Sequence, residues 1–282
     1  MNTPRDYDEL LQRVADWAFA QTDIHALILL GSRARPIDHP ADQWSDLDLI
    51  AFVADLNAYS RNAEWLAQFG SIAIQVLEHH SRGDAEWLIV YENGLKIDVL
   101  LAPSSNPIKA APYAVALQYG QQVLFDKTQS LSNEVHPIRP ALPDESTFTL
   151  HIQHFWLEAL RAAKLIRRGD LWRAKVSVDG ALKRYILTMM DWHTLSIDPT
   201  RNIWHDGRFL AEWLDRGVQS ALPATFAAFD PIDLWRALTN TIDLFRHLSQ
   251  DAASRLGLKY PSDLEQQASG WLAVIEKSAE VD

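Results

Sequence analysis

The stretch that decides the fold is ALILLGSRARPIDHPADQWSDLDLI, residues 26–50. It contains a short apolar run that stops at Gly31, and a second run that begins as Asp46-Leu47-Asp48-Leu49-Ile50. An apolar run that ends abruptly at glycine is typical of a buried strand, and strict alternation of polar and apolar residues indicates another strand. The segment therefore predicts two strands, joined by a loop that starts with Gly31-Ser32.

The Gly31-Ser32 pair directly after a strand is a candidate phosphate-binding turn. Glycine lets a phosphate approach the backbone, and the serine hydroxyl and nearby N–H groups can hold its oxygens. The alternative is an ordinary turn, which is the commoner outcome for such a pair taken alone.

Asp46 and Asp48 lie two residues apart at the start of a predicted strand, so their side chains point to the same face. Two carboxylates on one face repel each other unless water solvates both or a cation lies between them. Mg²⁺ suits this position because it takes carboxylate and phosphate oxygens as ligands. The alternative is an exposed strand end with two solvated acids.

Asp98 interrupts an otherwise apolar run, Leu95-Lys96-Ile97-Asp98-Val99-Leu100-Leu101. Burying an unpaired aspartate is costly. Lys96 lies on the same face of the predicted strand and is one candidate partner for it. The functional alternative is a third carboxylate that joins Asp46 and Asp48, either as a metal ligand or as the base that takes a proton from an attacking hydroxyl.

The rest of the first half predicts a mixed sheet of about five strands flanked by helices. Helical spacing of apolar residues predicts helices over 5–21 and 57–69. Asn93-Gly94 is a strong hairpin signal because both residues tolerate positive φ. The three further strands are predicted over 72–77, 87–91 and 95–101.

The second half predicts a helical bundle, so the fold class is α+β with two domains. An irregular, proline-rich connection over 102–145 separates the halves and places the boundary near residue 145, giving domains 1–145 and 146–282. Strand signals vanish beyond it. The helical patterns run through 147–168, 172–192, 206–216, 231–250 and 262–279.

Composition restricts the partners and the compartment. The formal net charge of −11 argues against a nucleic-acid duplex as the main partner and favours a cationic small molecule. The chain has no cysteine, which excludes disulfides and thiolate metal sites. No apolar run approaches the roughly 20 residues that cross a bilayer, and the start of the chain lacks the pattern of a signal peptide. We expect a soluble cytoplasmic protein, as a monomer or homodimer.

Taken in order, these features resemble the DNA polymerase beta-like nucleotidyltransferase superfamily. Within it, residues 30–36, 44–50 and 93–99 resemble the aminoglycoside 6-adenylyltransferase (streptomycin adenylyltransferase) family. The similarity continues into the helical half in the same order. The segments that carry it there are Phe155-Trp156, Leu171-Trp172-Arg173-Ala174-Lys175, Asp179, Met190-Asp191-Trp192-His193 and Gly207 before Phe209-Leu210.

The resemblance implies transfer of AMP from ATP to a hydroxyl of an aminoglycoside, with release of pyrophosphate and inactivation of the antibiotic. It also implies two magnesium ions held by Asp46, Asp48 and Asp98, with Asp98 the candidate general base. The triphosphate would be bound by Gly31, Ser32 and Arg35. The 1–145 region would be the nucleotidyltransferase domain, and 146–282 would contribute the acceptor site.

Three further polar residues of the helical half are candidates for binding. Lys175, Asp179 and Lys183 are spaced by four, which predicts one polar stripe on a helix. In the functional interpretation Lys175 binds the triphosphate and Asp179 binds an ammonium group of the acceptor, with Glu158 as a second acidic candidate. The alternative is a set of surface ion pairs.

Two other functions remain open. The same fold could modify another acceptor, such as a lincosamide, a small metabolite or a protein hydroxyl. A protein of another class, a catalytically silent nucleotide-binding module, is the second alternative, although all three carboxylates are present.

Overall fold

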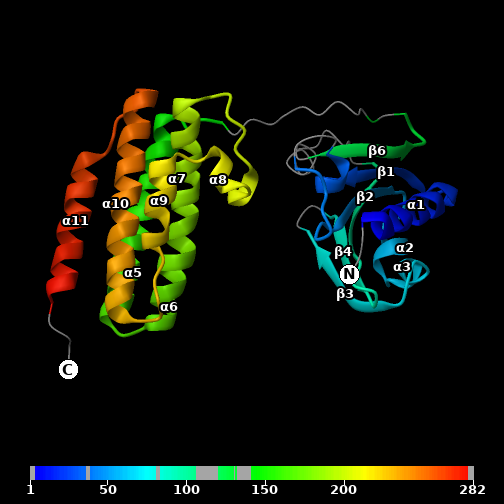
Figure 1. Cartoon of the computed structure of the whole chain (residues 1–282), viewed down its shortest axis with the longest axis horizontal. Coiled ribbons are helices and arrows are strands. Elements are labelled where there is room, and N and C mark those ends of the chain that lie inside the picture. Colours follow the sequence, from blue (N-terminus) through cyan, green and yellow to red (C-terminus); the bar gives the residue numbers. More distant parts are fainter. Residues whose placement is uncertain are drawn as a thin grey trace. The chain divides into compact units, whose positions relative to one another are not determined.

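The chain forms two compact units, Met1–Arg139 and Pro140–Asp282. The structure is a computed structural model that describes residues 4–35, 39–80, 83–105, 120–129, 131 and 141–278. The first unit contains the sheet, and the second is helical (Figure 1). The predicted connection over 102–145 therefore lies partly outside the described residues.

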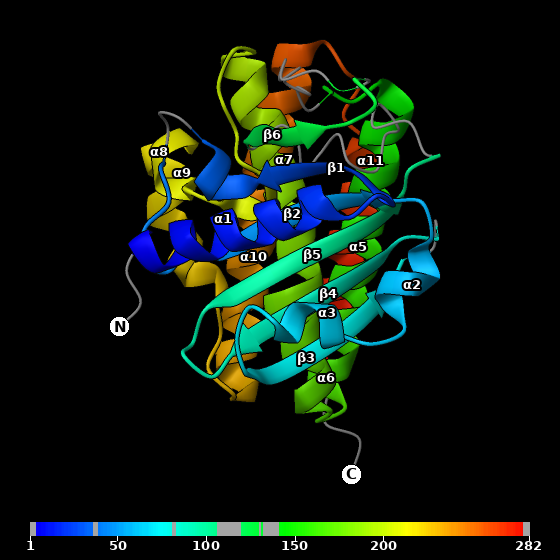
Figure 2. The same cartoon turned by 90° about the vertical axis from the view of Figure 1, so that its right-hand side faces the viewer.

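The sheet of the first unit has six strands in the order β3-β4-β5-β2-β1-β6 (Figure 2). The predicted mixed sheet is confirmed, but the expectation of about five strands missed β6 in the connection predicted as irregular. The run Gln121–Asp126 pairs with β1 although most of it is only half-buried, which is why its apolar signal is weak. The strands are β1 (Ile24–Leu30), β2 (Leu47–Val53), β3 (Ile72–His79), β4 (Ala85–Tyr91), β5 (Lys96–Pro103) and β6 (Gln121–Asp126).

The pairing of β2 with β5 is parallel, and all the other pairings in the sheet are antiparallel. The tight turn between β4 and β5 contains the predicted Asn93-Gly94 signal, and Gly94 has a φ of +84°. This hairpin returns the chain along β4 and brings β5 next to β2. Residues about fifty positions apart therefore meet in register, with Asp48 directly opposite Asp98.

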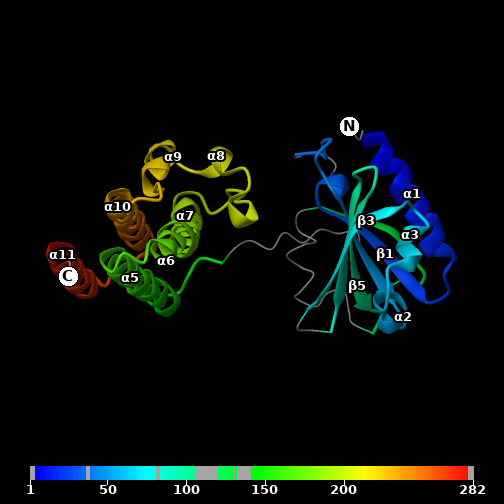
Figure 3. The same ribbon diagram turned by 90° about the horizontal axis from the view of Figure 1, so that it is seen from below.

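Three helices cover one face of the sheet: α1 (Pro4–Ala20), α2 (Leu56–Ser60) and α3 (Glu64–Ala67) (Figure 3). The predicted single helix over 57–69 is in fact the two short helices α2 and α3. Asp55 caps the start of α2 through the N–H of Asn57, and the side chain of Asn62 accepts a hydrogen bond from the N–H of Glu64. Polar side chains that bond the backbone locally start a new turn instead of extending a helix.

The main core lies between these helices and the sheet. Alternate residues of β2, β4 and β5 point into it, as the period of two requires. From the central strands they include Leu47 and Leu49 of β2 and Ile97 and Val99 of β5. The intervening residues point to the opposite face, where a smaller apolar cluster surrounds Ile50 and Phe52. Asp48 and Asp98 share that second face.

The second unit is a helical bundle, as predicted. Its long helices run side by side (Figure 1), and the rings of Phe155 and Phe245 stack between two of them with centroids 3.6 Å apart. A π-helical turn at Ser177–Ala181 joins α6 to α7 within one continuous helical stretch. The helices are α5 (Glu145–Arg167), α6 (Leu171–Val176), α7 (Leu182–Ile197), α10 (Pro231–Leu256) and α11 (Ser262–Lys277).

The helix predicted over 206–216 is wrong. Asp206, Gly207 and Phe209 all have positive φ, between +51° and +71°, which a right-handed helix does not tolerate. The segment instead contains two short helices, α8 (Leu210–Trp213) and, beyond it, α9 (Arg216–Ala221). Of the helices that the structure describes, none combines the length and apolarity needed to cross a bilayer.

Asp191 of α7 is a largely buried carboxylate whose charged form is destabilised by burial. Its Oδ1 is buried and accepts no hydrogen bond from the described part of the chain. Burial, and then the nearby charge of Asp206, raise the pKa of Asp191 from 3.8 to about 7. The folded protein therefore binds this proton more tightly than the unfolded chain does, and stability falls as pH rises from about 4 through about 7.

We expect Asp191→Asn to remove this pH-dependent loss. Between pH 5 and pH 8 the wild-type free energy of unfolding of the helical unit should fall by roughly 1 to 2 kcal/mol more than that of the variant. Urea denaturation followed by circular dichroism at both pH values measures the difference. Glu276→Gln, on the exposed surface of α11, serves as a matched control. Equal pH dependence in Asp191→Asn and wild type would contradict the prediction.

Candidate active site

The face of the sheet opposite α1–α3 brings two carboxylates together. Asp48 of β2 pairs with Asp98 of β5, and the row continues to Leu30 of β1 on one side and Leu88 of β4 on the other. Neighbouring strands lie about 4.8 Å apart, so carboxylates in one row are within direct electrostatic reach of each other. The two acids predicted to act together are therefore brought together by the parallel register.

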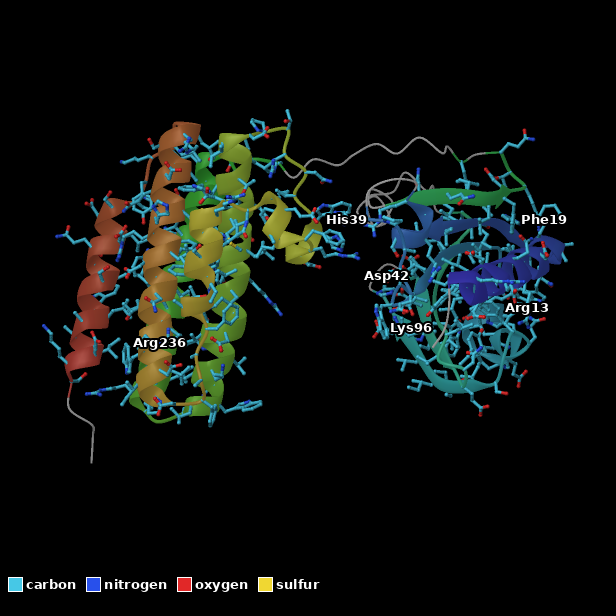
Figure 4. The ribbon with its side chains drawn as sticks, in the orientation of Figure 1. Arg13, Phe19, His39, Asp42, Lys96 and Arg236 are labelled. Atoms are coloured by element: carbon cyan, nitrogen blue, oxygen red, sulfur yellow. The ribbon has the colours of Figure 1, made fainter. Side chains whose placement is uncertain are left out.

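Asp46 joins this pair through Lys96. The Lys96 Nζ donates hydrogen bonds to Asp46 Oδ2 and to Asp98 Oδ2, each over 2.8 Å. Lys96 lies on the side of the unit away from Arg13 and Phe19 of α1 (Figure 4). The pairing of Lys96 with Asp98, which the sequence suggests as one alternative, is present. Its second bond, to Asp46, was not predicted.

The cluster carries more negative charge than Lys96 neutralises. Burial, and then the charges of Asp98 and Asp46, raise the pKa of Asp48 from 3.8 to about 6. Burial also raises the pKa of Asp98, although its bond to Lys96 opposes this. Asp98 Oδ1 is buried and accepts no hydrogen bond from the described residues. A buried carboxylate oxygen without a hydrogen-bond donor and an excess of carboxylates are both features that suit a bound cation.

The carboxylates are not arranged as a metal site in the described structure. In the described ranges, no group of three or more His, Cys, Asp or Glu side chains is arranged so that it could hold a metal ion as it stands. The Lys96 ammonium lies between Asp46 and Asp98 and forms an ion pair with each. The donor types fit magnesium, while their arrangement is that of an ion-paired cluster.

Gly31 brings the backbone against Asp48. Its φ is +68°, and a Cβ atom at this position would lie 2.8 Å from Asp48 Oδ2. Gly120 completes the contact, because the Gly31 N–H donates to the Gly120 carbonyl over 3.0 Å. Gly120 has a φ of +125°, and a Cβ atom there would lie 2.4 Å from the Gly31 carbonyl oxygen. Only two residues without side chains allow this close approach.

The predicted phosphate-binding residues lie at the same place. Gly31–Ala34 form one 3₁₀ turn, which contains Ser32, and the Arg35 N–H donates to the Ser32 carbonyl over 3.3 Å. The side chain of Arg35 passes beside Gly120, since a Cβ atom on that glycine would lie 2.6 Å from Arg35 Cγ. Gly31 is thus adjacent to Asp48, and Ser32 and Arg35 belong to the turn that begins at Gly31. Their role toward a nucleotide stays a prediction.

Arg33 fixes the loop that delivers Asp46, a role that the sequence interpretation missed. Its guanidinium donates to the carbonyls of Ser45 and Asp46 over 2.8 and 3.1 Å. It also lies 3.8 Å from the centroid of the Tyr7 ring, a cation–π contact. The Tyr7 hydroxyl accepts a hydrogen bond from the Lys96 backbone N–H over 3.3 Å. Tyr7 therefore connects this loop to the strand that bears Lys96.

The candidate residues of the helical unit are paired within that unit. Lys175 forms an ion pair with Asp179 and donates to the carbonyl of Ala227 over 2.6 Å. Glu158 accepts a hydrogen bond from Ser177 Oγ over 2.5 Å and forms an ion pair with Arg161 over 3.2 Å. Their predicted roles toward the triphosphate and the acceptor remain predictions.

Lys183, the third member of the predicted stripe, lies close enough to Asp179 and Lys175 for their charges to act on it. Its half-buried Nζ donates to the Val178 carbonyl over 2.9 Å and to Thr241 Oγ1 over 3.0 Å. Burial lowers its pKa to about 8.

Comparisons with known proteins agree with one family. The model of the streptomycin adenylyltransferase family matches residues 4–275. An aminoglycoside 6-adenylyltransferase of Bacillus subtilis is 26% identical over 270 residues, covering 91% of this chain and 93% of the relative. Those of Campylobacter jejuni and Staphylococcus aureus are 21% and 20% identical, covering 86% and 92% of this chain and 87% and 94% of theirs.

A crystal structure of an aminoglycoside 6-adenyltransferase from Bacillus subtilis covers 96% of this chain and 98% of its own, with 21% identity and a TM-score of 0.47. The family match extends through both units, from α1 in the first to α11 in the second. The chain therefore belongs to the streptomycin adenylyltransferase family, a family of nucleotidyltransferase enzymes.

Proposed function

We propose that this protein transfers AMP from ATP to a hydroxyl group of an aminoglycoside, with magnesium and with release of pyrophosphate. The observation that carries the proposal is the cluster of Asp46, Asp48 and Asp98 beside the glycine turn at Gly31. The named activity of the three relatives supports the adenylyl donor and the aminoglycoside acceptor. We place the reaction in the cytoplasm, where ATP is available.

Asp46, Asp48 and Asp98 are the residues that would hold magnesium, as two ions. Bound there, magnesium would neutralise phosphate charge and hold the phosphates in line for displacement. Two observations support this assignment: Asp98 Oδ1 accepts no hydrogen bond from the described residues, and burial, followed by the charges of Asp98 and Asp46, raises the pKa of Asp48.

The nucleotide would lie along the turn that begins at Gly31. The absence of a side chain at Gly31 leaves the backbone accessible, and Ser32 and Arg35 offer hydrogen-bond donors to phosphate oxygens. From the helical unit, Lys175 is proposed as a further phosphate ligand. In that case its ion pair with Asp179 must open, which would leave the Asp179 carboxylate for a cation of the acceptor.

The chemical step is a displacement at phosphorus. The acceptor hydroxyl oxygen forms a bond to the α-phosphorus, and the bond from that phosphorus to the bridging oxygen of the pyrophosphate breaks. The hydroxyl proton passes to a base, for which Asp98 is the candidate. Burial raises the pKa of Asp98, which makes it a stronger base than an exposed aspartate.

The acceptor is proposed to bind through its ammonium groups. The protein carries a net charge of −11, which attracts a polycation over a distance. Glu158 and Asp179 are the proposed contacts, since both are half-buried carboxylates on the same helical unit. Carboxylate–ammonium hydrogen bonds are stronger in such partly dry surroundings than in water.

An acceptor panel tests the reaction itself. With ATP and Mg²⁺, we expect pyrophosphate release to depend on an added aminoglycoside, and streptomycin to be among the active members. ATP labelled at the α-phosphate should transfer its label to the antibiotic, as mass spectrometry or chromatography would show. Label on a lincosamide, a metabolite or a protein instead would identify a different acceptor. No acceptor-dependent turnover across the aminoglycosides would contradict the proposal.

Asp48→Asn tests the carboxylate cluster. The change keeps the size of the side chain and removes one charge, so we expect turnover to fall by more than about a hundredfold. The variant should fold at least as stably as wild type above pH 7, because the raised pKa of Asp48 means that its charged form is unfavourable. Asp16→Asn on the exposed surface of α1 is the matched control. Unchanged turnover in Asp48→Asn would show that this cluster is not the metal site.

Gly31→Ala tests the close approach of backbone and carboxylate. The new methyl group would meet Asp48 Oδ2 at 2.8 Å, so turnover should fall by roughly tenfold to a hundredfold. Gly257→Ala is the matched control, because its φ of +67° is nearly the same but nothing lies within 4 Å of the added Cβ. Both variants should lose about 1 to 2 kcal/mol of stability in urea denaturation. Equal activity of the two variants would contradict the proposed role of Gly31.

A further inference from the structure

Lys96 occupies the centre of the carboxylate cluster. It lies two residues before Asp98 on β5, so the two side chains share a face of the sheet. From there the long side chain of Lys96 reaches both Asp46 and Asp98, at 2.8 Å each. The Lys96 side chain is 35% exposed, so its ammonium is partly screened from water and held by two carboxylates.

This ammonium stabilises an arrangement that would otherwise repel itself. Asp48 and Asp98 lie on adjacent strands and Asp46 directly before β2, and three carboxylates so placed raise one another's energy when no cation lies among them. A lysine ammonium is positively charged at neutral pH, and the Lys96 Nζ donates hydrogen bonds to both Asp46 and Asp98. Lys96 therefore serves as the counter-charge of the cluster.

The same oxygens are the ones that a metal ion needs. Magnesium binds carboxylate oxygens at about 2.0 to 2.1 Å and demands near-octahedral geometry. An ammonium that lies between Asp46 and Asp98 blocks that geometry and repels the ion. As they stand, the three carboxylates do not form a group that could hold a metal ion.

We propose that Lys96 is an internal counter-ion that competes with the divalent cation for Asp46 and Asp98 and swings away when the ion binds. The inference rests on the proposed function only in assuming that these carboxylates bind magnesium. Its consequence is an ordered assembly of the site. The free ion binds weakly because it must displace the ammonium. An ion that arrives with a nucleotide binds more readily, since the triphosphate adds negative charge to the site.

Metal titration of Lys96 variants tests this competition. Mn²⁺ binding to the full chain, without nucleotide, is measured by electron paramagnetic resonance or calorimetry. We expect Lys96→Gln to bind Mn²⁺ at least tenfold more tightly than wild type, and Lys96→Arg, which keeps the charge, to bind it no more tightly than wild type. With a non-hydrolysable ATP analogue present, the gain for Lys96→Gln should shrink. Lys127→Gln, at a lysine that donates to the Gln21 carbonyl, is the control.

The outcomes separate this inference from the proposed function. Equal or weaker Mn²⁺ binding by Lys96→Gln, with Asp48→Asn still weakening binding, would overturn the competition but leave the metal site intact. Absence of Mn²⁺ binding in wild type and Lys96→Gln alike, with and without the ATP analogue, would overturn the metal site and the competition together.

A second measurement uses the unaltered protein, so it does not depend on how the variants fold. Amine-labelling with mass spectrometry reports how accessible each lysine is. In metal-free protein Lys96 should react slowly, because two carboxylates hold its ammonium. Saturating Mg²⁺ should speed its labelling several-fold and leave Lys127 unchanged. Labelling of Lys96 that Mg²⁺ leaves unchanged or slows would contradict the proposal.

Discussion

Repulsion among three clustered carboxylates is the constraint around which the first unit is arranged. The parallel register places Asp48 beside Asp98, and Asp46 lies directly before β2. Lys96 of β5 neutralises part of this charge, while burial, and then the charges of Asp98 and Asp46, keep the pKa of Asp48 raised. The surrounding structure must hold the acids together against this repulsion, and Arg33 does so by fixing the loop before β2 through backbone carbonyls.

One face of the sheet packs in the main hydrophobic core, and the other carries the candidate active site. Helices α1–α3 cover one face, and the large apolar cluster beneath them is independent of the acids. The other face carries a smaller apolar cluster and the carboxylates. Period-two alternation makes this division possible, because Leu49 and Val99 point into the core while their neighbours Asp48 and Asp98 point away from it. A strained site is tolerated because the opposite face supplies the stability.

Local pattern was enough to predict part of this arrangement, and long-range register decided the rest. Gly31, Asp46 and Asp48 stand out because glycine after an apolar run and acids two apart have direct geometric meanings. Gly120 could not be found this way, since its contact with Gly31 depends on β6 pairing with β1 across about ninety residues. Local rules also failed where the backbone was irregular. Positive φ at Asp206 breaks the helix predicted over 206–216.

The same kind of ion pair occurs in both units. In each, a lysine pairs with partly buried carboxylates: Lys96 with Asp46 and Asp98, and Lys175 with Asp179. Such acids need a counter-charge, because burial removes the water that would otherwise solvate them. A lysine suits the task better than an arginine would, since its ammonium is a compact charge on a flexible stem, without the rigid bidentate grip of a guanidinium. It can therefore release its partners when a ligand of higher charge arrives, which a fixed arginine pair would resist.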